Sequence, residues 1–477
     1  MHVDIQTNQV GRVRATLEDY LSYWSVDVLD LERIVVSDGP VNKTDMDYLA
    51  SIAADPRSNL VRLDLSGTSF FETAGENDLL GNDVLEGCSL EYLALPSTGA
   101  FYAIGERALK DCPNLRRVEA AGAVSVGDEA FMGCEQLQDA VIPNARRIGD
   151  RAFFSCVGLE TVDMALVEHI GEEAFLDCAV KALHMPWAEE IGDGAFLNCP
   201  VEYADMMRLT TLGDRAFYGN THLLEIHLPN VQVVGKSAFE GCASVSMYTL
   251  EMGKVRAVRD NAFKGVTKLT ALLMPKVQSV GAEAFRASEI RSVHMPEVKA
   301  VSDRAFYGCD QLEEIEIADA ESIGASAFEE CAALASLNAK SVQSIGPSAF
   351  SGCVSLAQAN VKSVRTIGAQ AFRGCALSGI SLPNVTDIGQ GAFENCLLLD
   401  DVIWPDTQVV LGLSAFSGCA FDFTAGYGCL GNPAYAVTDD NVADYAARQA
   451  PKMMLRLDPP DGGRNIVQES AFQMPAA

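Results

Sequence analysis

The chain lacks any apolar run close to the roughly 20 residues that a membrane-spanning helix needs, although 48% of its 477 residues are hydrophobic. Its first residues, MHVDIQTNQVGRVRATLEDY, contain no apolar stretch like that of a secretory signal peptide. Basic residues are scarce, because 35 Lys and Arg stand against 65 Asp and Glu, a formal net charge of −30. We therefore expect no direct membrane insertion, no secretion signal at this end, and no nucleic acid as the partner.

The sequence also lacks the motifs of common catalytic and cofactor sites. Gly235-Lys236-Ser237 looks like the end of a phosphate-binding loop, but Asn230 stands where such a loop needs its first glycine. Serine, histidine and aspartate residues show neither nucleophile-elbow nor triad spacing. We predict a protein that is not an enzyme and that needs no cofactor.

What the chain has in abundance is one phrase, Ile-Gly-x-x-Ala-Phe-x-x-Cys. It reads IGDRAFFSC from Ile148, IGEEAFLDC from Ile170 and IGDGAFLNC from Ile191. The phenylalanines of the Ala-Phe pairs follow one another at intervals of 21 to 24 residues, from Phe131 to Phe416. A fixed period of this length predicts a solenoid, in which each repeat forms one coil and contacts its neighbours.

The second half of each repeat reads Leu-x-x-Val-x-Leu/Met-Pro, as in LLEIHLP from Leu223 to Pro229. Its alternation of apolar and polar residues indicates a strand, which the proline ends. A second, shorter strand leads to the glycine turn, and Ala-Phe-x-x-Cys is expected to form one 3₁₀ or α turn with the phenylalanine pointing inward. Stacked coils of this kind predict two parallel sheets, a spine of phenylalanines and a ladder of cysteines.

Thirteen of the fourteen cysteines close the repeat phrase, and Cys429 lies outside it. Side chains at equivalent positions of stacked coils point the same way about 4.8 Å apart, which does not give the converging geometry of a disulfide. Asn220, Val266 and Ser288 occupy the same position in other repeats. We expect small buried core residues, and free thiols in this number favour the cytoplasm or another reducing compartment over the alternative, the cell surface.

The phrase with its following leucine, Ile-Gly-x-x-Ala-Phe-x-x-Cys-x-x-Leu, closely resembles the BspA-type leucine-rich repeat, over roughly residues 80 to 420. The resemblance implies a right-handed leucine-rich-repeat superhelix with parallel sheets, mainly β with short helical turns. It also implies adhesion or protein binding, the role of many relatives. Relatives of the adhesin kind usually carry a secretion signal and a surface anchor.

The two ends of the chain differ from the middle, as the caps of a solenoid do. We expect residues 1–79 to form an N-terminal cap with longer leucine-rich repeats, including helices around Val13 to Val26 and in DMDYLASIAAD. Residues 80–420 form the BspA-type solenoid. Residues 421–477 form an α/β C-terminal cap and tail, with a helix starting at Thr438 and a strand in KMMLRLD.

The candidates for binding are the outward positions of the predicted strands, between two inward apolar residues. His184, His227 and His294 take such positions, but they lie about 10 and 15 Å apart along the stack, so they cannot share a metal ion and we predict no metal site. From residue 203 to 316 the face is acidic, with aromatic, histidine and apolar interruptions, and Arg259 and Ser302 replace the phrase glycine nearby.

An exposed apolar patch with a polar rim is typical of a contact site. Sequence drift without functional consequence, local to a few of many similar repeats, explains the same pattern equally well. The hypothesis of a contact site gives this partner-binding set: Tyr203, Asp205, Glu225, His227, Met247, Thr249, Leu273, His294, Glu314 and Glu316. The predicted function is a non-enzymatic scaffold that binds a protein partner on this acidic strand face. Two alternatives stay open, a cell-surface or secreted adhesin for host or matrix proteins and a structural subunit of a large assembly. The oligomeric state is equally open.

Overall fold

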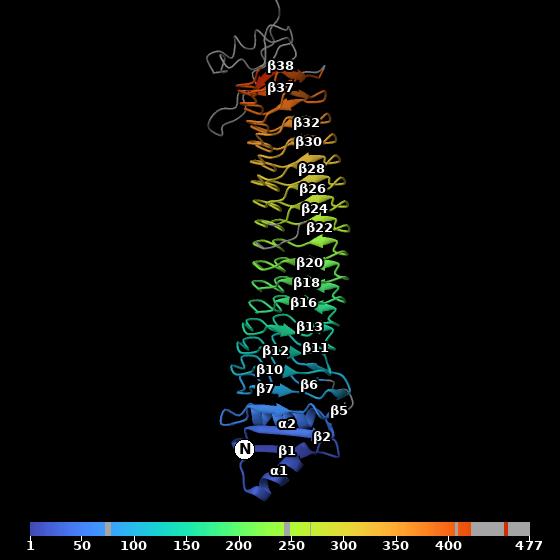
Figure 1. The fold of residues 1–477 in the computed structure, drawn as a ribbon, viewed down its shortest axis with the longest axis vertical. Helices are drawn as coiled ribbons and strands as arrows, with labels where there is room; N and C mark the ends of the chain where they lie inside the picture. The colour runs from blue at the N-terminus through green and yellow to red at the C-terminus, as the bar shows by residue number, and fades with distance from the viewer. Residues whose placement is uncertain (72–77, 243–248, 268, 406–408, 421–452, 457–477) are drawn as a thin grey trace, which may run out of the picture. The chain divides into compact units, whose positions relative to one another are not determined.

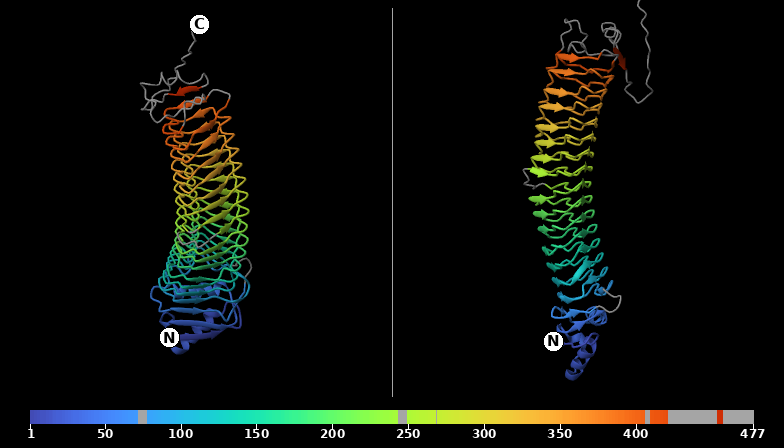
Figure 2. Two further views of the ribbon diagram at one scale, coloured as in Figure 1. Left: turned by 45° about the horizontal axis from the view of Figure 1, so that its top comes forward. Right: turned by 90° about the vertical axis from the view of Figure 1, so that its right-hand side faces the viewer.

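The computed structural model describes residues 1–71, 78–242, 249–267, 269–405, 409–420 and 453–456. The chain divides into two compact units, an N-terminal unit (Met1–Leu269) and a C-terminal unit (Thr270–Ala477), each described by itself. Within each unit, short strands of successive coils pair in parallel and lie one above another (Figures 1 and 2). The predicted β-solenoid with few helices is therefore confirmed.

The N-terminal unit begins with two α-helices and two strands, β1 and β2, that are longer than any strand of the coils that follow. Both predicted helices are present, as α1 and α2, and the sequence analysis missed the first strand, which pairs in parallel with β2. The elements are β1 (His2–Gln6), α1 (Val13–Trp24), η1 (Val28–Asp30), β2 (Arg33–Asp38), β3 (Pro40–Val41), α2 (Lys43–Ala53), β4 (Arg62–Asp64), β5 (Ser69–Phe70) and β8 (Thr98–Gly99).

One buried carboxylate joins the starts of the two helices. Asp45, only 2% exposed, accepts hydrogen bonds from the backbone N–H groups of Gly11 (2.8 Å), Val13 (3.0 Å) and Asn42 (3.3 Å). The Asn42 side chain accepts from the Asp45 N–H at 3.1 Å, which completes a capping box on α2. Because Val13 is the first residue of α1, the carboxylate that caps α2 also satisfies a free N–H of α1.

The coils of the N-terminal unit carry two kinds of strand. The longer strands form the first sheet: β7 (Tyr92–Ala94), β10 (Arg117–Glu119), β12 (Asp139–Val141), β14 (Thr161–Val162), β16 (Ala182–His184), β18 (Tyr203–Asp205), β20 (Glu225–His227) and β22 (Thr249–Glu251). The second sheet precedes the glycine turns: β6 (Asp78–Leu80), β9 (Tyr102–Ile104), β11 (Ala123–Val126), β13 (Arg147–Ile148), β15 (His169–Ile170), β17 (Glu190–Ile191), β19 (Thr211–Leu212), β21 (Val233–Val234) and β23 (Ala257–Val258).

The C-terminal unit repeats this arrangement. Its first sheet contains β24 (Ala271–Leu273), β26 (Ser292–His294), β28 (Glu314–Glu316), β30 (Ser336–Asn338), β32 (Gln358–Asn360), β34 (Gly379–Ser381) and β36 (Asp401–Ile403). Its second sheet contains β25 (Ser279–Val280), β27 (Ala300–Val301), β29 (Ser322–Ile323), β31 (Ser344–Ile345), β33 (Thr366–Ile367), β35 (Asp387–Ile388), β37 (Val409–Gly412) and β38 (Met453–Arg456). The strand predicted in KMMLRLD is β38, parallel to β37, whereas the predicted helix from Thr438 and the rest of the C-terminal cap lie outside the described residues.

The phenylalanines of the repeat form a stacked spine in the core of each unit. Seven rings stack in the N-terminal unit, from Phe131 to Phe263, and seven in the C-terminal unit, from Phe285 to Phe416. Neighbouring centroids lie 4.8 to 5.7 Å apart and the ring planes differ by 3 to 16°. All of these rings are buried. The predicted spine is confirmed, and its spacing is that of neighbouring strands in a sheet.

The turn around each phenylalanine differs from the expected helical turn. It has hydrogen bonds from residue i+3 to residue i, as from the Cys134 N–H to the Phe131 carbonyl at 3.1 Å. However, the residue two before the phenylalanine is left-handed, such as Glu129 with φ 53°, and so is the residue two after it, such as Gly133 with φ 74°. These two residues stop the turn from continuing as a helix. The second of them is often glycine or asparagine, which adopt this conformation at low cost.

The glycine of the phrase is needed for close packing between coils rather than for its own backbone angles. A Cβ atom on Gly149 would lie 2.6 Å from the Asp128 nitrogen of the preceding coil, a distance that real Cβ atoms do not reach. The Asp128 carboxylate in turn accepts the Asp150 N–H at 2.9 Å. The coils therefore approach closely at the turn, and a short side chain bridges them.

Each cysteine of the ladder makes a directed contact as well as filling space. In twelve coils the thiol donates to the main-chain carbonyl of the residue in the phenylalanine position one coil earlier, with S···O distances of 2.9 to 3.2 Å. Where Asn220 replaces cysteine, its Nδ2 donates to the Phe196 carbonyl at 2.7 Å. Cysteine and asparagine at this position therefore donate the same hydrogen bond, a role that the sequence analysis, which predicted packing alone, did not include, although Val266 fills the position without a donor. All thirteen described cysteines are free and buried.

Replacing Asn220 by cysteine is expected to stabilise the N-terminal unit. The Asn220 side chain is fully buried, and its Oδ1 has no hydrogen-bond partner among the described residues. A buried unsatisfied acceptor costs about 1–3 kcal/mol. Asn220→Cys keeps a donor for the Phe196 carbonyl and removes that acceptor, so we expect a higher urea midpoint. Asn220→Val removes the donor as well and serves as the control. A midpoint for Asn220→Cys at or below that of Asn220→Val would contradict the donor role.

The buried thiols predict that the fold loses stability in alkaline solution. Burial raises the pKa of Cys199, Cys242, Cys353 and Cys396 to about 12, from 9.0 for an exposed thiol. Between pH 9 and 12 the folded chain therefore holds protons that the unfolded chain has lost. Stability is fully present below pH 9 and falls above it, by up to about 1.4 kcal/mol per pH unit for each such thiol.

Urea unfolding at pH 8, 9 and 10 measures this loss. A variant with Cys199→Ser, Cys242→Ser and Cys353→Ser keeps three donors but removes three thiols that ionise, so its stability should fall less steeply with pH. Equal slopes for the two proteins would show that other groups control the alkaline transition.

Candidate functional site

The first sheet of each unit presents the outward residues that the sequence analysis singled out. In a three-residue strand the middle side chain is buried and the two flanking side chains face outward, as in β20, where Ile226 is buried between Glu225 and His227. Parallel pairing in register places equivalent outward residues side by side in neighbouring coils. The sheet therefore presents two outward rows of side chains within each unit.

In the N-terminal unit, β16, β18 and β20 carry a patch that we call the N-terminal acidic patch (His184, Tyr203, Asp205, Glu225 and His227). Asp205 pairs in register with His184 on one side and with His227 on the other. His184 Nδ1 lies 3.5 Å from Asp205 Oδ2, and His227 Nε2 lies 3.0 Å from Glu225 Oε1. The patch is thus a row in which histidines and carboxylates alternate.

Tyr203 packs within the same patch. Its ring meets the ring of His227 edge to face, with centroids 5.9 Å apart, and its strand neighbour in register is Glu225. Partial burial, together with the charges of Asp205 and Glu225, raises the pKa of the Tyr203 hydroxyl above its usual value. The hydroxyl therefore stays protonated and available as a hydrogen-bond donor next to two carboxylates.

In the C-terminal unit, β24, β26 and β28 carry a second patch, the C-terminal acidic patch (Leu273, His294, Glu314 and Glu316). Leu273 pairs in register with His294, and His294 pairs with Glu316. His294 Nδ1 lies 2.5 Å from Glu316 Oε2, and the Leu273 side chain remains 38% exposed. An apolar side chain thus borders a histidine–carboxylate pair.

The structure describes most of the predicted partner-binding residues, and each within its own unit. Met247 lies outside the described residues, and Thr249 belongs to β22, whose side chains are not described. Arg259, which replaces the phrase glycine, has its guanidinium 3.2 Å from the Asp214 carboxylate. This ion pair links its coil to an earlier one in the same unit, so the departure at Arg259 has a structural role.

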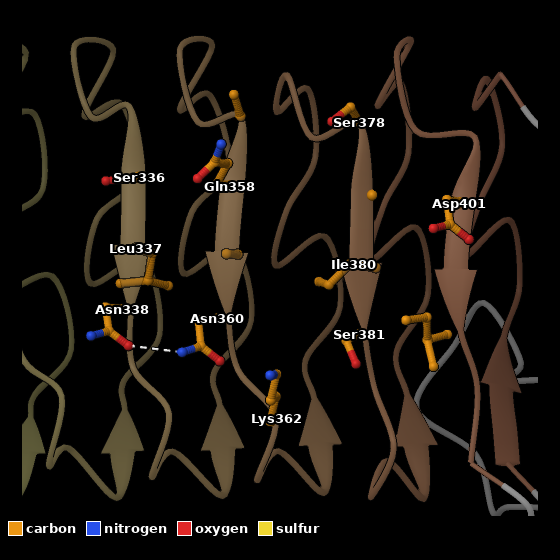
Figure 3. A pocket seen from close by; sticks show the side chains of 14 residues that line it. Ser336, Leu337, Asn338, Gln358, Asn360, Lys362, Ser378, Ile380, Ser381 and Asp401 are labelled. Atoms are coloured by element: carbon orange, nitrogen blue, oxygen red, sulfur yellow. Dashed lines mark hydrogen bonds between the residues drawn. The ribbon is translucent and has the colours of Figure 1, made fainter.

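A hollow of about 560 Å³ lies on the first sheet of the C-terminal unit, across β30, β32, β34 and β36 (Figure 3). Its polar lining contains Asn338, Gln358 and Asn360, together with serines of the same strands. The sequence analysis placed no site here. Gly379 gives the missing signal, since it stands at an outward position without a side chain, whereas alanine at the position of Ala359 also occurs in β12 and β18.

Among the described residues, no three His, Cys, Asp or Glu side chains gather in a way that could hold a metal ion. In the same part of the chain, no helix is both long and apolar enough to cross a bilayer.

Comparison with known proteins identifies the repeat. The family described as BspA type leucine rich repeat region (6 copies) matches residues 70–181, 189–313 and 299–422. A search of curated proteins finds no match. Among solved structures, a leucine-rich repeat protein from Bacteroides ovatus is 23% identical, with a TM-score of 0.51 over 70% of this chain and 87% of that one.

Two further structures are similar in sequence. The T. pallidum leucine-rich repeat protein is 26% identical over 44% of this chain and 86% of its own, with a TM-score of 0.30. A leucine-rich cell surface protein from Faecalibacterium prausnitzii is 18% identical over 66% of this chain and 87% of its own, with a TM-score of 0.31. The fold rests on the Bacteroides protein, and the family on the repeat match, which spans more than half of the chain. This chain belongs to the BspA-type leucine-rich repeat family.

Proposed function

We propose that the chain is a non-enzymatic scaffold that binds a protein partner through its acidic patches. The observation that carries the proposal is the alternation of histidines and exposed carboxylates in register on the first sheet. The side chains of Glu225 and Glu316 remain 57% and 51% exposed although each pairs with a histidine. Carboxylates in such rows accept bidentate hydrogen bonds from arginine, so the partner surface is basic.

The charge of the whole chain supports the same partner. A formal net charge of −30 attracts a basic surface over distances of about 8–10 Å at physiological salt and raises the rate of association. The strands hold the carboxylates on a rigid sheet, so binding costs little conformational entropy beyond that of the carboxylate side chains. Tyr203 and Leu273 add an aromatic and an apolar contact beside the charges, a combination found in protein interfaces.

A photocrosslinking residue introduced at Leu273 tests whether this face meets a partner. Leu273 is exposed beside His294 and Glu316, whereas Thr366 is an exposed residue of β33 in the second sheet and serves as the control position. We expect a protein to be linked from position 273 and not from position 366. The linked protein, identified by mass spectrometry and purified, is the reagent for affinity measurements.

Charge reversal then measures what the acidic patches contribute to that affinity. Glu225→Arg and Glu316→Arg are each expected to raise the Kd at least tenfold, a loss of about 1.4 kcal/mol, and to weaken the salt dependence of binding. Glu172→Arg and Glu289→Arg reverse exposed charges in the turns of the N-terminal and C-terminal units and are the matched controls. If all four variants bind as the wild type does, the acidic patches are not the binding surface.

A further inference from the structure

The hollow on the C-terminal unit lies where two neighbouring strands carry small residues, Ala359 in β32 and Gly379 in β34. Leu337 and Ile380 are buried at the middle positions of β30 and β34, whereas Ala359, at the middle of β32, is partly exposed. Gly379, at the first position of β34, contributes no side chain. Among the described residues, no strand ladder joins β32 to β34. The same kind of break separates β14 from β16, so the small residues and the lining, rather than the break, distinguish this place.

The lining of the hollow is close to neutral in a strongly acidic chain. Three amides, from Asn338, Gln358 and Asn360, and three serine hydroxyls line it, with one positive side chain, Lys362, and one negative side chain, Asp401. The apolar part comes from the aliphatic side chains of the four strands, including Ile403, which is 55% exposed. Figure 3 shows the amides on adjacent strands along one side of the hollow.

Two of the amides are already oriented toward each other. Asn360 Nδ2 donates to Asn338 Oδ1 at 3.0 Å, across the in-register pair of β30 and β32. This bond fixes both side-chain planes and leaves the Nδ2 group of Asn338, an exposed residue, free of any intramolecular bond shown among the described residues. An amide fixed in this way offers a donor and an acceptor with little loss of side-chain entropy on binding.

We propose that this hollow binds a neutral carbohydrate. Amides and hydroxyls both donate and accept hydrogen bonds, which matches the hydroxyl groups of a sugar, each also a donor and an acceptor. A lining without net charge favours a neutral ligand over an ionic one. The exposed aliphatic surface of Ile403 suits the C–H face of a sugar ring, and a volume of about 560 Å³ lies within the range of small-ligand sites.

An extended peptide fits the same hollow less well. Peptide recognition on a sheet draws on main-chain pairing at an exposed edge and on pockets for alternate side chains. Here the hollow lies on the face of β30, β32, β34 and β36, so a ligand meets mainly their outward side chains. The proposal concerns residues outside both acidic patches, so it does not depend on the proposed protein partner.

Titration of the full chain with neutral tetrasaccharides tests the proposal. The probes are cellotetraose, maltotetraose, mannotetraose and chitotetraose, followed by saturation-transfer NMR and calorimetry, with the peptide (Gly-Ser)₅ as a competitor. We expect at least one sugar to bind, with a Kd in the micromolar to millimolar range, and the peptide not to displace it. Absence of binding by all four sugars up to about 10 mM, or binding of the peptide alone, would overturn the proposal.

Variants that fill the hollow show whether binding occurs there. A Cβ atom on Gly379 meets nothing closer than 3.4 Å, so Gly379→Val should fold and should weaken sugar binding at least tenfold. Ser381→Leu enlarges an outward side chain of β34 that lines the hollow, with the same expected effect. Asn338→Ala removes an amide and should weaken binding severalfold.

Matched controls separate this proposal from the protein-binding one. Ser292→Val changes the same strand position in β26, away from the hollow, and should leave sugar binding unchanged. Glu225→Arg, in the N-terminal unit, should also leave it unchanged while it weakens the protein partner. Sugar binding that persists in both Gly379→Val and Ser381→Leu would place the sugar elsewhere and refute the assignment of the hollow.

Discussion

Parallel pairing of strands from coil to coil sets a spacing of about 4.8 Å that every other feature of this protein must match. Phenylalanine rings stacked 4.8 to 5.7 Å apart match it, and so does a cysteine that reaches one carbonyl of the preceding coil. The glycine of the phrase permits the closest approach, where a Cβ atom on Gly149 would lie 2.6 Å from a main-chain nitrogen. A repeat that violates the spacing disturbs both neighbours, so the phrase is constrained by its contacts above and below.

The same constraint separates structure from function along each repeat. The inward residues and the turns are committed to stacking, and the outward residues of the first sheet are free to vary. Their variation is not isolated, because register brings like positions together. Asp205 lies between His184 and His227 for this reason, and Asn338 meets Asn360. A solenoid therefore builds a surface from residues about 22 positions apart in the sequence.

Periodicity in the sequence predicts the coils, the spine, the outward positions and both N-terminal helices, because each follows from spacing or from local amphipathicity. Strand β1 was missed, since five residues, HVDIQ, carry too little pattern to identify a strand without its partner β2. The left-handed residues, such as Glu129, were missed because a charged residue gives no sign of that conformation. The sequence analysis missed the donor role of the cysteines, which the structure shows because the Asn220 amide donates the same hydrogen bond. It missed the hollow because only the packing of neighbouring strands defines that volume.

Departures from the phrase have different consequences at different positions. At the glycine position, Arg259 is accommodated by an ion pair with Asp214, so the change is absorbed by structure. At an inward position, Ala359 leaves volume unfilled, and Gly379 beside it leaves the opening uncovered. Leucine at Ala359 would add buried apolar area worth about 2 kcal/mol, which alanine does not supply. The opening at Gly379 lies on the outward face, next to the mutually oriented amides of Asn338 and Asn360, and this placement is the physical argument that the hollow serves a ligand rather than the fold.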